Sequence, residues 1–118
     1  MVYLGSSLSL ATLETLVHTP RFKLLEESYV YFEVTLPDEH ILVLESHNLP
    51  EDWQSTELPR STQRIGDAWI KSQTSLALSV PSRVMPQEHN YLLNPAHPKR
   101  AELVFKGPYP FRFDERLA

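Results

Sequence analysis

The stretch LALSVPSRVMPQEHNYLLNP (residues 76–95) begins with apolar residues typical of a buried strand and continues as a polar segment punctuated by prolines. Ser82, Glu88, His89 and Asn90 follow the apolar run directly, and we expect them to lie in a loop. Loops at strand ends often carry functional side chains. Two interpretations are therefore open: an ordinary polar loop after a core strand, or one wall of a site.

Outward from this stretch, alternating and helical apolar patterns predict the other elements. Ser6 or Ser7 is a suitable N-cap for the first helix, and Ser61 for the second. Few helices among several strands favour an α+β fold with a mixed or antiparallel sheet, in a single domain spanning residues 1–118. We expect helices at 6–18 and 61–73, strands at 1–5, 29–37, 41–44, 75–80, 101–106 and 109–114, and a long surface loop at 46–60.

Composition excludes several classes of function. With 42% apolar and 22% charged residues the chain is that of a globular protein. A net charge of −4 without a basic cluster argues against direct binding to nucleic acid. There is no cysteine, no apolar run of membrane-spanning length and no basic n-region at the start, so we expect a soluble, unexported, cytoplasmic protein without a membrane partner.

Familiar catalytic and metal-binding motifs are missing. Three glycines cannot build a dinucleotide fingerprint or a phosphate loop. The pairs His40/His47 and His89/His97 are only loose candidates for metal ligands, so no metal site is predicted. Ser82 lacks a G-x-S-x-G elbow, which leaves a hydrolase triad unsupported.

Glu14 is the acidic residue of the first predicted helix, and it lies beside Leu10 on the helical wheel. Leu10, Leu13, Leu16 and Val17 share one arc, so the helix should be largely enclosed. A carboxylate removed from water costs several kcal/mol unless it is paired or hydrogen-bonded. Glu14 is either a rim residue that points to water or touches His18, or a functional carboxylate.

Four segments together resemble the RES domain, a bacterial toxin family named for its arginine, glutamate and serine. They are VYLGSSLSLATLETLVH, STQRIGDAWI, LALSVPSRVMPQEHNYLLNPAHP and PFRFDERL, and they run through almost the whole chain. The resemblance implies a fold similar to the ADP-ribosyltransferase toxins. It also implies an enzyme that attacks NAD as its substrate, without a further cofactor, and an Xre-like helix-turn-helix antitoxin as its partner.

The resemblance also assigns the site. The family's glutamate falls on Glu14, its serine on Ser82 and its active-site tyrosine on Tyr3. We therefore expect Glu14 and Ser82 to be catalytic residues, and Tyr3, Ser82 and Asn90 to bind the substrate. The expected chemistry is phosphorolysis or hydrolysis of the nicotinamide–ribose bond, with ADP-ribosyl transfer to a protein as a variant. Under this interpretation the polar segment after residue 81 is one wall of the NAD site.

One departure from the family affects these expectations. The family's arginine and its GGRWN-like segment lie upstream of the strand that holds Tyr3, and the sequence starts at that strand. We therefore expect an N-terminally truncated RES domain, or one whose start was assigned to a downstream methionine, that binds NAD weakly and self-associates into a homo-oligomer. The alternative is a catalytically silent RES-like module that binds an antitoxin or another protein.

Overall fold

The computed structural model describes residues 2–54 and 60–117, and its main sheet has four strands in the order β1-β5-β4-β3. These strands are β1 (Val2–Gly5), β3 (Ile41–Val43), β4 (Ala77–Pro81) and β5 (His89–Leu93). β5 pairs antiparallel with both β1 and β4, whereas β3 runs parallel to β4. This sheet confirms the α+β class with mixed strand directions.

β5 is the main correction to the sequence prediction, which placed residues 81–95 in a loop. Residues His89–Leu93 form a strand between β1 and β4, with Asn90 opposite both Gly5 and Val80. Local apolar alternation does not reveal this strand, because its first two residues, His89 and Asn90, are polar. Pairing along both edges satisfies its backbone, and that pairing is not encoded in local periodicity.

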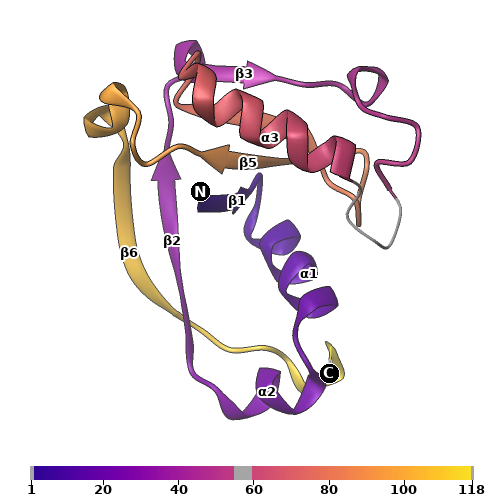
Figure 1. Ribbon diagram of the computed structural model, residues 1–118. Coiled ribbons are helices and arrows are strands. Elements are labelled where there is room, and N and C mark those ends of the chain that lie inside the picture. Colours follow the sequence, from indigo (N-terminus) through magenta and orange to yellow (C-terminus); the bar gives the residue numbers. More distant parts are fainter. Residues whose placement is uncertain (1, 55–59, 118) are drawn as a thin grey trace.

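The first helix, α1 (Leu8–His18), descends from the end of β1 (Figure 1). Ser7 is its N-cap, as predicted, and its hydroxyl accepts a 3.0 Å hydrogen bond from the amide of Leu10. A Cβ atom at Gly5 would lie 3.0 Å from the amide nitrogen of Ala11, so the helix starts very close to the strand. The expectation that α1 is largely enclosed is wrong, because Leu10 is buried but Val17 is exposed.

The helix α3 (Arg60–Ser72) lies across one face of the main sheet (Figure 1). It begins at Arg60, one residue before Ser61, whose side chain lies outside the described part of the structure. Trp69 is buried, as predicted, and its indole N–H donates a 2.8 Å hydrogen bond to the Ser75 hydroxyl. The apolar pattern of this helix predicts both Trp69 and Ala68 on its inner side, but Ala68 is exposed.

A second sheet is a long two-stranded ribbon made of β2 (Tyr29–Thr35) and β6 (Val104–Phe111). The two strands predicted at 101–106 and 109–114 are one strand that continues through the glycine and proline between them. The register with β2 shifts between Tyr31 and Glu33, opposite Gly107. Gly107 has φ of +127°, and a Cβ there would lie 2.9 Å from the carbonyl oxygen of Tyr31.

One face of this ribbon exposes apolar side chains. The predicted alternation of β2 is confirmed, yet the face that carries its apolar residues is open to solvent. Phe32 is 53% exposed and Phe105, from β6, is 56% exposed. We call this surface the apolar ribbon face, and it comprises Val30, Phe32, Val34, Phe105 and Pro110.

A short helix that the sequence did not predict, α2 (Arg21–Glu26), connects α1 to the ribbon at its lower end (Figure 1). There the rings of Tyr29 and Phe111 each make an edge-to-face contact with Phe113. Such contacts stabilise aromatic clusters beyond their buried area. Single 3₁₀ turns complete the described secondary structure, at Asp38–His40, Ser46–Asn48, Pro98–Glu102 and Glu115–Leu117.

The predicted loop at 46–60 is only partly described. Trp53 within it is 9% exposed and belongs to the core. Residues 55–59 of this loop, including Pro59, lie outside the described residues. Within residues 2–54 and 60–117, no helix has the length and apolar character needed to span a membrane.

Candidate active site

Three of the residues assigned from the sequence lie together between α1 and the central strands. The Ser82 hydroxyl donates a 2.6 Å hydrogen bond to Oε1 of Glu14, and Asn90 Nδ2 donates a 2.9 Å hydrogen bond to the same oxygen. Glu14 comes from α1, Ser82 directly follows β4, and Asn90 lies on β5. We call these three residues the carboxylate cluster.

Glu14 therefore has the partners that its place on an apolar helix requires. Two donors hold Oε1, and no partner is recorded for Oε2 among residues 2–54 and 60–117. A carboxylate that is held through one oxygen keeps a fixed orientation while the other oxygen can still accept a hydrogen bond from a ligand. The rim interpretation of Glu14 does not account for two hydrogen bonds from residues so distant in sequence.

Ser82 is held on both sides of its hydroxyl. Its oxygen accepts a 3.0 Å hydrogen bond from the amide of Met85, and its proton points to Glu14. The residue is 0% exposed. Its buried hydroxyl can orient Glu14 in this arrangement, whereas a direct contact of Ser82 with a substrate stays a prediction.

Tyr3 lies on β1, opposite Leu92 of β5. Because alternate residues of a strand share a face, Tyr3 is on the same face of the sheet as Asn90, and diagonal neighbours across strands lie roughly 7–8 Å apart. Its side chain is 72% exposed. Tyr3 thus shares the sheet face of Asn90, and within residues 2–54 and 60–117 it makes no hydrogen bond to Glu14 or Ser82.

A second polar group lies on the opposite face of β5, and sequence analysis missed it. The Ser79 hydroxyl is 2.8 Å from Nδ1 of His89, and Nε2 of His89 is 3.9 Å from Oε2 of Glu45. Successive strand residues point to opposite faces, so His89 points away from the side of Asn90. Only the pairing of β4 with β5 brings Ser79 near His89, and no local motif signals it.

The histidines do not form the pairs that the sequence considered for metal binding. Nε2 of His40 lies 2.6 Å from Oε2 of Glu102, and Glu39 approaches the same imidazole. His97 accepts from the amide of Lys99 through Nδ1. Glu39, His40 and Glu102 form a ligand set that a metal could use, and the contact between His40 and Glu102 is an ion pair only when the imidazole is protonated.

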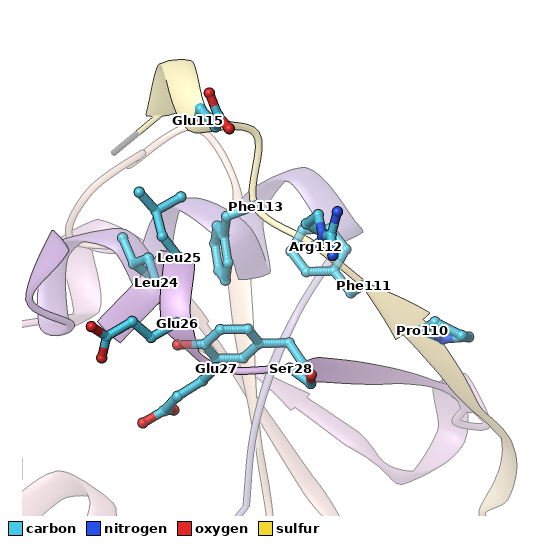
Figure 2. Close-up of a pocket in the computed structure, with 11 residues that line it drawn as sticks. Leu24, Leu25, Glu26, Glu27, Ser28, Pro110, Phe111, Arg112, Phe113 and Glu115 are labelled. Carbon is cyan, nitrogen blue, oxygen red and sulfur yellow. The ribbon is translucent and has the colours of Figure 1, made fainter. Parts of the chain in front are cut away.

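A separate hollow of the surface lies away from the carboxylate cluster. This hollow, of about 570 Å³, lies at the lower end of the ribbon, and Figure 2 shows Phe113 beside Leu25 there. The Phe113 ring also makes an edge-to-face contact with Tyr29. Its lining comes from α2, the start of β2 and the chain around the end of β6, and it includes no member of the carboxylate cluster. We base the candidate site on the hydrogen-bonded cluster, because concavity without converging polar groups defines no chemistry.

The fold and the cluster together define an α+β domain that holds a half-buried carboxylate between its first helix and the central strands. The chain belongs to the RES domain family, whose model matches residues 1–114. It is 42% identical over 117 residues to "Toxin Res" of Yersinia enterocolitica, covering 98% of this chain and 76% of that protein. It is 35% identical over 120 residues to "Prs ADP-ribosylating toxin" of a Sphingobium species, covering 99% of this chain and 74% of that protein.

Proposed function

We propose that this chain is a RES-type toxin that cleaves NAD at the bond between nicotinamide and ribose. The observation that carries the proposal is the carboxylate cluster, in which Glu14 is fixed through Oε1 and keeps Oε2 for a ligand. The family membership and the name of the Sphingobium relative support the same class of chemistry. We further propose that the reaction takes place in the cytoplasm, in a single domain.

The proposed role of Glu14 follows from the charge that develops during cleavage. As the C–N bond to nicotinamide breaks, its electron pair leaves with the nicotinamide ring and the ribose gains oxocarbenium character. A carboxylate that is already in place stabilises this positive charge, directly or through a ribose hydroxyl, without reorganising. An oxygen of phosphate or water then forms the new C–O bond, and water releases its proton to the solvent.

The other residues serve this step from different positions. Ser82 and Asn90 are proposed as positioning residues, because both donate to Glu14. Tyr3, an exposed residue on the sheet face of Asn90, is proposed to orient the ligand with its ring and hydroxyl. ADP-ribosyl transfer would break the same bond and differ only in the acceptor, so the acceptor decides between phosphorolysis, hydrolysis and transfer.

The direct test is product analysis. Purified protein is incubated with NAD in buffers with and without phosphate, and the products are separated by chromatography. We expect free nicotinamide in both buffers, with a phosphorylated ADP-ribose product only where phosphate attacks. Incorporation of labelled ADP-ribose into a bacterial lysate reveals transfer to a protein. Folded protein that releases no nicotinamide under any of these conditions would exclude the enzymatic function.

We also propose a protein partner, an Xre-like helix-turn-helix antitoxin, as part of a toxin–antitoxin system. The supporting observation is the apolar ribbon face, where Phe32 and Phe105 are more than half exposed. The radius of gyration of 15.2 Å exceeds the roughly 13 to 14 Å of a compact domain of this length. The same surface favours self-association of free chains, and it would serve equally in a catalytically silent module.

A further inference from the structure

The loop that follows β4 is fixed by its own hydrogen bonds. The amide of Ser82 donates a 2.8 Å hydrogen bond to the carbonyl of Glu88, and the amide of Glu88 donates a 2.9 Å hydrogen bond to the carbonyl of Met85. The amide of Met85 in turn donates to the Ser82 hydroxyl. The backbone of this loop therefore has a defined position beside the carboxylate cluster.

Arg83 follows Ser82 in this loop and carries an unsatisfied buried donor. Its Nε atom is buried and has no hydrogen-bond partner, while the side chain as a whole is half-buried. No carboxylate is paired with Arg83 among residues 2–54 and 60–117, in contrast to Arg116, which pairs with Asp114. A buried N–H group that loses water without gaining an acceptor is destabilising, and an anion is the kind of ligand that would supply the acceptor.

A second unsatisfied atom lies at the other end of the same segment. Oδ1 of Asn90 is buried without a partner, although Nδ2 of the same amide binds Glu14. The residues around the cluster thus offer one unused donor that suits an anion and one unused acceptor that suits a hydroxyl or amide. A phosphorylated sugar supplies both complementary groups.

We propose that Arg83 binds a phosphate group at this site, and that Asn90 Oδ1 accepts from a hydroxyl or amide of the same ligand. The inference rests on the proposed function and names the subsite that holds the anionic part of the substrate. A guanidinium binds phosphate oxygens through a planar fork of N–H groups, and the bonds are strengthened by charge. The shared chemistry is phosphate, supplied either by the pyrophosphate of NAD or by an attacking inorganic phosphate.

The test uses binding without turnover. ADP-ribose and inorganic phosphate are titrated separately into the parent protein and into Arg83→Gln, Arg83→Lys and Arg64→Gln, with calorimetric detection. Arg64 is an exposed residue of α3, so Arg64→Gln removes the same charge from another surface. Circular dichroism establishes whether each variant is folded. If Arg83→Gln does not fold, the milder Arg83→Lys is compared with the parent in its place.

We expect Arg83→Gln to weaken ADP-ribose binding at least tenfold, Arg83→Lys to lie between it and the parent, and Arg64→Gln to match the parent. Dependence on Arg83 for inorganic phosphate alone would assign it to the attacking phosphate, which also supports the proposal. Equal affinities for both probes in all variants, or no binding to the parent, would overturn it. Arg83-dependent binding without NAD cleavage would refute the proposed function and leave this subsite standing. Cleavage of NAD by Arg83→Gln at the parent rate would refute the subsite and leave the proposed function standing.

Discussion

The Ser82 hydroxyl lies 2.6 Å from Oε1 of Glu14 although 68 residues separate the two in sequence. The contact joins the first helix to the end of a central strand, and the amide of Met85 fixes the hydroxyl from the other side. Since this oxygen has a single proton, the geometry commits that proton to Glu14. We therefore propose that Ser82 acts by positioning the carboxylate of Glu14.

Replacement of this serine should reduce the rate more than the apparent affinity. Ser82→Ala removes one hydrogen bond to a charged group and leaves the Met85 amide without its partner. Such a loss costs about 1–3 kcal/mol, so we expect kcat for NAD cleavage to fall about 10- to 100-fold with little change in KM. Steady-state kinetics measure the effect, and Ser9→Ala, on the exposed side of α1, is the matched control.

A double-mutant cycle separates positioning from a general loss of stability. If Ser82 acts through Glu14, Ser82→Ala should have much less effect on kcat in a Glu14→Gln background. Full additivity of the two substitutions in kcat would mean that Ser82 works independently of the carboxylate.

Asn90 tests whether the cluster holds a negative charge. Asn90→Asp would bring a second carboxylate to within about 3 Å of Glu14, whereas Asn90→Ala only deletes a donor. Like charges placed together cost several kcal/mol, so we expect the free energy of unfolding at neutral pH to be lower for Asn90→Asp than for Asn90→Ala. Urea denaturation followed by tryptophan fluorescence measures the difference. Equal stability of the two variants would contradict a charged Glu14.

The sequence predicted the elements whose patterns are local. The first helix and β2 follow from a serine cap and from clean alternation, and the structure confirms both. β5 could not be predicted in this way, because its first residues are polar and its neighbours on both edges come from distant segments. The helix α2 was missed because its six residues are too few to show the apolar periodicity of a helix.

The site was predictable to a different degree. A lone carboxylate on an apolar helix marked Glu14 as a residue that needs a partner, but no spacing rule names that partner. The family resemblance assigned Ser82, the polar segment after the predicted strand drew attention to Asn90, and the structure brings both to Glu14. The sequence gives no sign that Nε of Arg83 is buried without a hydrogen-bond partner, because this depends on which groups surround the atom in the folded chain.

Gly107 provides a test of the ribbon. Its φ of +127° is strained for any residue with a side chain, and an added Cβ would meet the carbonyl oxygen of Tyr31 at 2.9 Å. We expect Gly107→Ala to lower the free energy of unfolding by about 1–3 kcal/mol. Urea denaturation measures this, with Gly66→Ala in α3 as a comparison that should not destabilise. A Gly107→Ala protein as stable as the parent would show that the ribbon can change its backbone at this position.

The apolar ribbon face should govern association. Phe105→Lys places a charge on this face, whereas Val104→Lys places one on the opposite face of the same strand. Both positions are half exposed or more, so we expect each variant to remain within about 0.5 kcal/mol of the parent stability. Light scattering should show a lower average mass for Phe105→Lys alone. A mass unchanged by Phe105→Lys, or lowered equally by both substitutions, would show that the apolar ribbon face does not govern association.

The most direct test of the account compares nicotinamide release by the parent and by Glu14→Gln under identical conditions. Glutamine keeps the shape and can still accept from Ser82 and Asn90, so the fold should be nearly as stable while the charge is gone. Glu51→Gln, at an exposed position, is the matched control. We predict that the parent and Glu51→Gln release nicotinamide and that Glu14→Gln is slower by at least about 100-fold, as expected when a preorganised charge is lost. Release by Glu14→Gln at the parent rate would contradict the central claim that this carboxylate drives cleavage of NAD.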